Sequence, residues 1–205
     1  MNRIRIAVLV SGGGTNLQAL IDACRDGRLH SGEIALVLSS KPGAYALTRA
    51  AEAGIDTVTV SKKECGSQAA FEERIAAALE ARGIEMVVLA GFLSILTESF
   101  TARYAGRMIN VHPSLIPAFC GKGMYGLRVH EAALAYGVKV TGATVHFVNE
   151  IPDGGRIIAQ KAVEILPGDT PELLQKRVME QAEWKLLPQA AETVAASLLK
   201  NKEIF

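Results

Sequence analysis

The chain has 205 residues, of which 49% are hydrophobic and 21% charged, an ordinary composition for one globular domain with a sizeable core. Its 22 basic and 21 acidic side chains leave a net charge of +1, so bulk charge argues against binding to nucleic acid or an anionic membrane. Three widely spaced cysteines with no CxxC pair fit a reducing cytosol rather than a disulfide framework or a zinc site.

The first half of the chain alternates predicted strands with predicted helices. A β-rich run at 4–10 ends in a glycine turn at 11–16, and apolar residues at helical spacing follow until Gly27. Further strands are predicted at 34–38, 57–60 and 86–90, and helices at 44–53 and 69–81. The helix at 69–81 is expected to bury Phe71, Ile75 and Leu79.

The glycine turn at 11–16 is typical of a phosphate site, because bare backbone N–H groups and a helix N-terminus face the anion. It is not the dinucleotide fingerprint, since Leu17 stands where the third glycine belongs and no acidic residue ends the second strand. No GxxxxGK[ST] loop occurs either. The turn therefore predicts a monophosphate site, and a tight turn that binds nothing is the alternative.

The apolar residues 92–96 follow the strand at 86–90, at the end of the sheet where ligands bind in α/β folds. An apolar loop at that place is either a plug of the core or the wall of a pocket for a flat ring. The residues alone leave both interpretations open.

A further strand, at 109–112, delivers Asn110 and His112 at its C-terminal end. The two-residue period of a strand puts both side chains on one face. An amide donor beside an imidazole suits a reaction that stabilises an oxyanion while it moves a proton. Taken alone, however, an Asn-x-His sequence indicates more simply a hydrogen-bonded core histidine beside a turn.

The second half continues with a predicted helix at 129–136, a long alternating strand at 138–148, a turn-rich loop at 149–155 and a hairpin strand at 156–165. Thr170 is the predicted N-cap and Pro171 the first residue of a terminal helix, which Pro188 kinks or separates from a helix running to about 199. The fold class is therefore α/β: a Rossmann-like, mostly parallel sheet with helices on both faces and a C-terminal antiparallel hairpin.

Several polar residues have a simple local interpretation. Asp153 in Pro-Asp-Gly-Gly is a turn residue, and His146 is a sheet-face histidine. By the same local reasoning His30, His130 and Glu183 are solvated and Cys120 is an unreactive thiol. None of these residues supports catalysis by itself.

Together, five segments resemble the folate-dependent formyltransferases in order and spacing, over about residues 4–188. They are Ser-Gly-Gly-Gly-Thr-Asn at 11–16, Leu-Ala-Gly-Phe-Leu-Ser-Ile-Leu at 89–96, Ile-Asn-Val-His-Pro-Ser-Leu-Ile-Pro at 109–117, Thr-Gly-Ala-Thr-Val-His-Phe-Val at 141–148 and Asp-Gly-Gly at 153–155. The resemblance implies transfer of a formyl group from N10 of 10-formyltetrahydrofolate to the amine of a glycinamide ribonucleotide in purine biosynthesis.

The resemblance also implies roles for individual residues. Asn110, His112 and Asp153 are expected to be catalytic: the first two hold the oxyanion, His112 serves the proton transfers, and Asp153 raises the pKa of His112 by favouring its charged form. Gly14, Thr15, Asn16 and Glu183 are expected to bind the ribonucleotide. The expected folate-binding residues are Gln68, Leu93, Ser94, Ile95, Leu96, Asn110, Asn149, Glu150, Ile151 and Pro152.

Two departures from the family pattern affect the folate site. Gln68 and Ser94 stand where some members place arginines that meet the folate, so Lys122 or Arg128 is an alternative partner for its glutamate tail. Glu183 matches a family glutamate only if one residue is inserted before it. The segment 119–126 also looks longer than in the commonest form, and no metal is expected.

Within this resemblance we expect one domain over residues 1–205, with the phosphate-binding part at about 1–105 and the folate and catalytic part at about 106–205. The expected partners are small molecules, without nucleic acid or membrane, for a cytoplasmic monomer or homodimer. A hydrolase of formyltetrahydrofolate or a transferase acting on methionyl-tRNA usually carries a further domain, for which 205 residues leave no room. A non-catalytic sensor that uses only the phosphate loop is the alternative from a different class.

Overall fold

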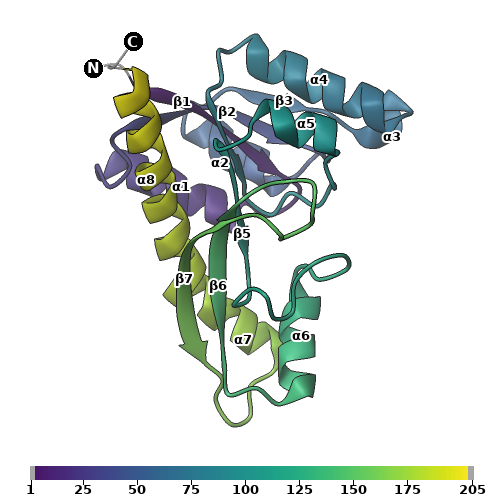
Figure 1. The fold of residues 1–205 in the computed structure, drawn as a ribbon, viewed down its shortest axis with the longest axis vertical. Helices are drawn as coiled ribbons and strands as arrows, with labels where there is room; N and C mark the ends of the chain where they lie inside the picture. Colours follow the sequence, from purple (N-terminus) through teal and green to yellow (C-terminus); the bar gives the residue numbers. More distant parts are fainter. Residues whose placement is uncertain (1–2, 203–205) are drawn as a thin grey trace.

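The computed structural model describes residues 3–202, and within them seven strands form a single sheet in the order β3-β2-β1-β4-β5-β6-β7 (Figure 1). The first five strands pair in parallel, whereas β6 runs antiparallel to both β5 and β7. The α/β sheet with a C-terminal antiparallel hairpin is therefore confirmed.

The elements agree with the sequence prediction within a few residues. The strands are β1 Ile4–Val10, β2 Gly32–Ser39, β3 Thr57–Thr59, β4 Met86–Leu89, β5 Met108–His112, β6 Val140–Phe147 and β7 Ile157–Glu164. The helices are α1 Thr15–Arg25, α2 Tyr45–Glu52, α3 Lys62–Cys65, α4 Gln68–Glu80, α5 Glu98–Arg103, α6 Leu127–Tyr136, α7 Pro171–Val178 and α8 Trp184–Lys202. The sequence did not predict α3 and α5, which are too short to show a helical period.

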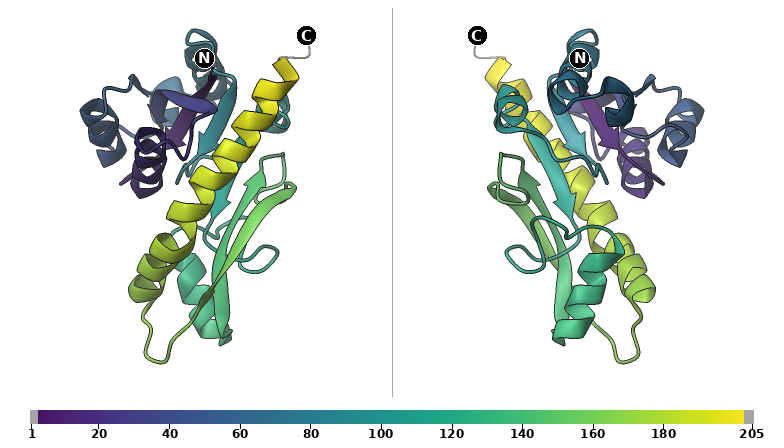
Figure 2. Two further views of the ribbon diagram at one scale, coloured as in Figure 1. Left: turned by 90° about the vertical axis from the view of Figure 1, so that its left-hand side faces the viewer. Right: turned by 90° about the vertical axis from the view of Figure 1, so that its right-hand side faces the viewer.

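Both faces of the sheet are covered, and β1 shows how the sequence achieves this. Ile6 and Val8 point into one apolar core, which α1, α2, α7 and α8 close. Ala7 and Leu9 point into the other, which α4 and α5 close. A strand buried on both faces must be apolar at every position, as β1 nearly is. Figure 2 shows α8 crossing the first of these faces as one long diagonal rod.

The C-terminal helix differs from the prediction at Pro188. Its start is as expected, because the Thr170 side chain accepts a hydrogen bond from the Leu173 N–H and Pro171 follows the cap. Pro188 does not divide the helix, however, since α8 runs through it. The regular helix is instead interrupted earlier, by a π-helical turn (η1) at Met179–Glu183. Pro188 has no N–H for the carbonyl of Trp184, the first residue of α8, so the missing hydrogen bond falls at the start of the helix.

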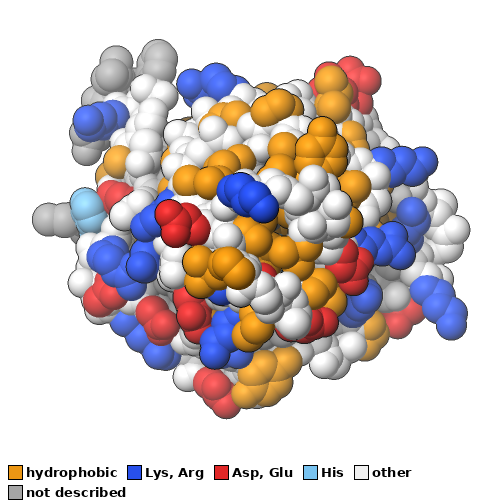
Figure 3. Space-filling view, turned by 90° about the horizontal axis from the view of Figure 1, so that it is seen from below, with side chains coloured by type: hydrophobic (Ala, Val, Ile, Leu, Met, Phe, Trp, Pro, Cys, Tyr) orange, Lys and Arg blue, Asp and Glu red, His pale blue; other side chains and the backbone are white. Residues whose placement is uncertain are grey.

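The surface carries charges of both signs. Viewed from below, apolar side chains gather near the centre of a rim of mixed charge (Figure 3). Tyr136, Val140, Leu166 and Leu173 are exposed apolar residues from elements at this end of the molecule. No helix among residues 3–202 is long and apolar enough to span a membrane.

Candidate functional site

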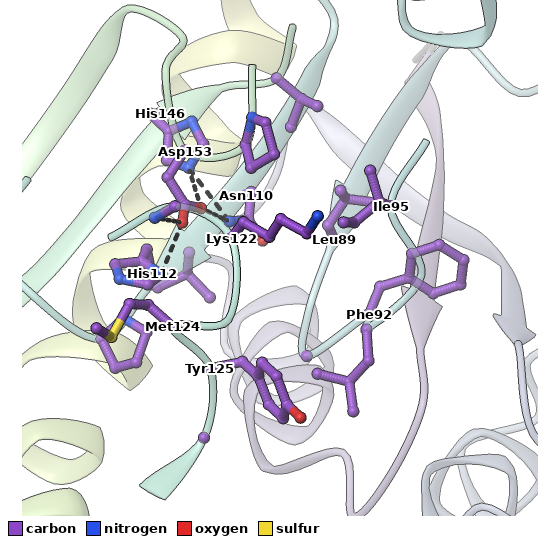
Figure 4. Close-up of a pocket in the computed structure, with 18 of the residues that line it drawn as sticks. Leu89, Phe92, Ile95, Asn110, His112, Lys122, Met124, Tyr125, His146 and Asp153 are labelled. Atoms are coloured by element: carbon purple, nitrogen blue, oxygen red, sulfur yellow. Dashed lines mark hydrogen bonds and ion pairs between the residues drawn. The ribbon is translucent and has the colours of Figure 1, made fainter. Parts of the chain in front are cut away.

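One cavity of about 340 Å³ opens where the start of α1 meets the loops after β4, β5 and β6 (Figure 4). The segment 121–126, α6 and the helical region from α7 to η1 complete its wall. The three residues expected to be catalytic all line it, although they come from a strand end and from a loop 43 positions later in the chain.

Asp153 stands between Asn110 and His112. Its Oδ2 is 3.4 Å from Nδ1 of His112, and its Oδ1 is 3.5 Å from the amide nitrogen of Asn110. Asn110 and His112 project from the same face of β5, as the two-residue period predicts. The fold therefore brings these three side chains into direct contact.

The turn interpretation of Asp153 is also correct, because the turn is what delivers the carboxylate. Asp153 has a left-handed backbone with φ of 58°, a conformation that Asp tolerates better than most residues. A Cβ on Gly155 would lie 1.7 Å from the Phe147 carbonyl oxygen, so only glycine lets the chain return so closely over β6. Asp153 is thus a turn residue and a site residue at once.

His146 is a member of the cluster that local reasoning assigned only to the sheet. It is 2% exposed, and its Nδ1 donates to the Phe147 carbonyl at 2.8 Å. When the ring is neutral, Nε2 therefore accepts a hydrogen bond from the Asn110 amide, 3.2 Å away. Nε2 is also 3.6 Å from Oδ1 of Asp153. His146 lies directly opposite Asn110 in the β5–β6 pairing, and this register was the signal that could have revealed it.

Both ring nitrogens of His112 face acceptors. Nε2 donates to the Phe119 carbonyl at 2.9 Å, and Nδ1 faces Asp153. This geometry suits a doubly protonated ring. Burial nevertheless lowers the pKa of His112, and the opposing effects of Asp153 and the Phe119 carbonyl do not outweigh it. Asp153 therefore acts in the expected direction, but the net pKa of His112 is lowered, because desolvation of the buried ring exceeds the attraction of one carboxylate.

The pKa of Asp153 lies below its ordinary value. Burial acts to raise it, but the nearby rings of His146 and His112 and the hydrogen bond from the Gly121 N–H together outweigh that effect. The Gly121 N–H donates to Oδ2 at 2.8 Å. At neutral pH the cluster consequently holds a fixed carboxylate beside its two imidazoles.

The glycine turn after β1 forms the edge of the same cavity. Gly14 is the left-handed N-cap of α1, and a Cβ there would lie 2.6 Å from that of Ala46. The Asn16 amide donates to Glu183 at 2.7 Å, and both residues line the cavity. Gly14 and Thr15 adjoin it without lining it. Of the residues expected to bind the ribonucleotide, the fold therefore brings Asn16 and Glu183 into the cavity.

Glu183 is buried, so its interpretation as a solvated charge is wrong. Burial raises the pKa of its carboxyl group, and the hydrogen bond from Asn16 opposes that increase. Glu183 is the last residue of the π turn. A π turn holds more residues than an α turn of the same helix, so the one-residue insertion that the resemblance implies would fit in this turn with Glu183 in the cavity wall. Helix patterns in the sequence give no signal for such a turn.

The opposite wall is largely apolar. Leu96 is buried, whereas Leu93 and Ile95 are more than half exposed. The residues of the expected folate site that line the cavity are Leu93, Ser94, Ile95, Leu96, Asn110, Asn149, Glu150, Ile151 and Pro152. The pocket-wall interpretation of the loop after β4 is therefore favoured over the core plug.

Gln68 lies outside this cavity. It borders an adjoining shallower hollow, which shares Glu150 and the loop after β4 with the main cavity. Its amide donates to the Ile95 carbonyl at 3.0 Å and to Glu72 at 2.6 Å, so here it braces the wall. Lys122 lines the main cavity, whereas the Arg128 guanidinium stacks over the Tyr125 ring.

Two further histidines contrast with each other. His30 is exposed, as expected, and pairs with Glu192 at 3.2 Å. His130 is 1% exposed and lines the cavity, so its interpretation as a solvated residue is wrong. Burial, with a smaller contribution from His112, lowers the pKa of His130 to about 4. The sequence places His130 near the start of a helix, but it does not show that this residue of α6 faces the interior.

Cys120, expected to be unreactive, has a thiol pKa raised by burial and by the nearby Asp153 carboxylate, and its Sγ is 3.2 Å from the Pro117 carbonyl. Among residues 3–202 no group of three or more His, Cys, Asp or Glu side chains is arranged to hold a metal ion.

Known proteins match this chain over nearly the range of the resemblance, which was about residues 4–188. The model of the Formyl transferase family matches residues 4–191. A phosphoribosylglycinamide formyltransferase of Haemophilus influenzae is 39% identical, over 97% of this chain and 91% of its own. The human trifunctional purine biosynthetic protein adenosine-3 is 43% identical over 98% of this chain, but this chain spans only 19% of that protein.

Solved structures agree. A glycinamide ribonucleotide transformylase of Symbiobacterium toebii superimposes with a TM-score of 0.89 at 42% identity, covering 95% of this chain and 89% of that one. A phosphoribosylglycinamide formyltransferase of Brucella melitensis gives 0.87 at 42% identity, covering 95% and 97%.

Proposed function

The chain belongs to the formyl transferase family, and we propose that it moves the formyl group of 10-formyltetrahydrofolate to the amine of glycinamide ribonucleotide, a step of purine biosynthesis. The observation that carries the proposal is the contact of Asn110, His112 and Asp153 in one cavity between a phosphate-type turn and an apolar wall. The activities named for full-length relatives support it.

In this reaction the amine nitrogen attacks the formyl carbon, and the carbonyl oxygen gains negative charge. One N–H of the Asn110 amide donates to His146 at 3.2 Å, and the other faces Asp153 at 3.5 Å. This second N–H is the one that would turn to the developing oxyanion. The imidazole of His112, when protonated, is the other donor. A preorganised donor of this kind is worth about 10²–10³ in rate.

Completing the transfer requires that the bond between the formyl carbon and N10 breaks. The attacking amine loses one proton, and N10 of the departing tetrahydrofolate gains one. His112 serves both movements, with Asp153 stabilising its charged form. Nε2 of His112 donates to the Phe119 carbonyl at 2.9 Å, so we infer that Nδ1, on the side of Asp153, is the nitrogen nearer to the reaction.

The placement of the substrates follows from the two walls. The apolar side chains after β4, with backbone groups of residues 149–152, suit a flat heteroaromatic ring that needs both stacking surface and hydrogen bonds. The turn at 11–16 and the N-terminus of α1 suit the phosphate, and Glu183 suits the amine end of the ribonucleotide. The cavity lies where the proposed phosphate-binding part, 1–105, meets the proposed folate and catalytic part, 106–205.

We also propose that the chain acts as a single domain in the cytoplasm, as a monomer or homodimer, on small molecules without a metal or nucleic acid. A net charge of +1 with both signs interspersed over the surface supports this proposal.

The experiment that tests the proposal measures tetrahydrofolate release from 10-formyltetrahydrofolate with and without glycinamide ribonucleotide. We expect release only when the ribonucleotide is present, with one formylated ribonucleotide formed per tetrahydrofolate. Release of formate at the same rate without ribonucleotide would instead identify a hydrolase. Binding of the ribonucleotide without turnover would identify a sensor.

A further inference from the structure

His130 is the histidine of the cavity that the proposed mechanism does not use. Its ring is 1% exposed, and neither ring nitrogen has a hydrogen-bond partner among residues 3–202. The other two cavity histidines differ, because every ring nitrogen of His112 and His146 faces a polar group. Buried polar atoms are nearly always paired, so an imidazole with two free nitrogens at a cavity wall points to a partner that enters the cavity.

The position of His130 shows which substrate it meets. It lies in the first turn of α6, which packs beside α7 (Figure 1). The α7–η1 side of the cavity carries Met179, whose sulfur is 3.8 Å from the Thr15 hydroxyl. The same side carries Glu183, which meets Asn16. From this packing we infer that His130 lies nearer to the phosphate turn than to the apolar wall after β4, which is the proposed folate site.

The chemistry of the ring limits what it can bind. With a pKa of about 4 the imidazole is neutral at physiological pH, and a neutral imidazole offers one donor and one acceptor. A phosphate or a carboxylate would prefer a charged ring, and an ammonium group would leave the donor unused. A hydroxyl or an amide, which both donates and accepts, fits both nitrogens.

We propose that His130 hydrogen-bonds a neutral hydroxyl or amide group of the ribonucleotide, between its phosphate and its amine, and so contributes to the affinity for that substrate. The inference rests on the proposed function and adds a residue to the ribonucleotide site. His130 acts in binding and takes no part in the proton transfers.

Calorimetric titration of glycinamide ribonucleotide at pH 7 tests this role in four proteins: wild type, His130→Leu, His130→Gln and His30→Leu. We expect His130→Leu to raise the Kd roughly tenfold or more, because the ligand group loses its partner in a buried site. Gln keeps a donor and an acceptor, so His130→Gln should recover part of the affinity. His30 is exposed, and its variant should bind like wild type.

Three further measurements distinguish a binding role of His130 from a purely structural one. Binding of a folate analogue that lacks a transferable formyl group should be unchanged in every variant. In turnover, KM for the ribonucleotide should rise while kcat stays within about twofold of wild type. In wild-type protein, the ¹⁵N signals of the His130 ring should shift on addition of ribonucleotide and not on addition of the folate analogue, a test that needs no stable variant.

A wild-type Kd for the ribonucleotide in His130→Leu, or ring signals that ignore the ribonucleotide, would overturn the inference. Equal weakening of ribonucleotide and folate binding would do the same, because it indicates a damaged cavity. Failure of the wild-type protein to bind the ribonucleotide at all contradicts the proposed function instead, so the two failures are distinguishable.

Discussion

At the scale of single residues, Asp153 and Glu183 show how the fold gives two carboxyl groups different roles. Asp153 is held ionised by His146, His112 and a backbone N–H, so its pKa is low. Glu183 has one amide partner and is almost fully buried, so its pKa is high. Both line one cavity, and their surroundings push their pKa values in opposite directions, as in sites that bind or transform charged ligands.

The raised pKa of Glu183 predicts that Glu183→Gln stabilises the ligand-free protein at neutral pH. Because the folded-state pKa lies above the unfolded value, stability falls as the pH rises through the folded pKa and the buried group ionises. Glutamine removes that cost and still accepts the hydrogen bond from Asn16. We expect a gain of about 1 kcal/mol, or ~2–4 °C in Tm, in thermal unfolding at pH 7.

The same variant should bind the ribonucleotide more weakly, because it lacks the charge for the amine end. Glu180→Gln is the matched control, since Glu180 lies on the same π turn with its side chain about half exposed. The control should change neither Tm nor affinity. A Tm of Glu183→Gln below that of wild type contradicts the assignment of a destabilising buried carboxylate.

The sequence could predict the position of a residue only where neighbouring residues in the chain determine its surroundings. The strand period predicted that Asn110 and His112 share one face at the carboxyl end of β5, whereas their catalytic role was expected only from the family resemblance. His130 and Glu183 were wrongly expected to be solvated, because their burial depends on elements that are distant in the chain. His146 lies in the sheet as expected, but its place in the site depends on its pairing with β5. Local patterns report the preferences of a segment and not what packs over it.

At the scale of elements, the π turn at Met179–Glu183 explains how an extra residue is tolerated before Glu183. The flanking helices α7 and α8 keep their buried faces, with Leu174 and Val178 before the turn and Leu187 after it. Strands and long helices were predictable from their periods, whereas a five-residue change of helical type leaves no period to detect.

We predict that deletion of Glu180 converts the π turn into a regular α-helical turn. The buried faces of α7 and α8 then keep their directions, and Glu183 stays near Asn16. We expect a Tm within about 3 °C of wild type and a ribonucleotide KM within about threefold, measured by thermal unfolding and steady-state kinetics.

Deletion of Gln189, an exposed residue inside α8, is the control. It rotates the rest of the helix by about 100° and turns its apolar face away from the sheet, so the protein should be strongly destabilised. Equal damage from both deletions would show that the π turn does not hold a removable residue.

At the scale of the whole molecule, one sheet runs through both proposed parts of the chain. The sequence predicted the kind of sheet but not the order of its strands. The alternation of strands and helices followed by a hairpin indicated a mostly parallel sheet with an antiparallel end, which is what forms. The closure of the cavity was not predictable, because Asp153 reaches His112 only through a loop that folds back over β6.

The buried histidines predict how global stability depends on pH. The pKa of His130 falls from 6.5 to about 4 on folding, and that of His112 is lowered too. At these two rings the unfolded chain therefore binds more protons than the folded one, so their contribution to stability is complete above about pH 6.5 and decreases as the pH falls to about 4, opposite in sign to that of Glu183. His130 alone accounts for a loss of ~3 kcal/mol at most.

Urea unfolding at several pH values between 7 and 4.5 measures this loss. His130→Gln should flatten the pH dependence, whereas a His30→Gln control should keep the wild-type slope because His30 is exposed. An unchanged slope in His130→Gln would contradict the assignment of a neutral buried ring.

The central claim is that the Asp153 carboxylate drives formyl transfer through His112, and kcat of Asp153→Asn tests it most directly. Asparagine keeps the shape of the side chain and an oxygen for the Gly121 N–H, but removes the charge. At saturating concentrations of both substrates we predict that kcat falls by ~10²–10³, while the Kd of each ligand in calorimetry stays within about threefold. A kcat within about twofold of wild type would contradict the account.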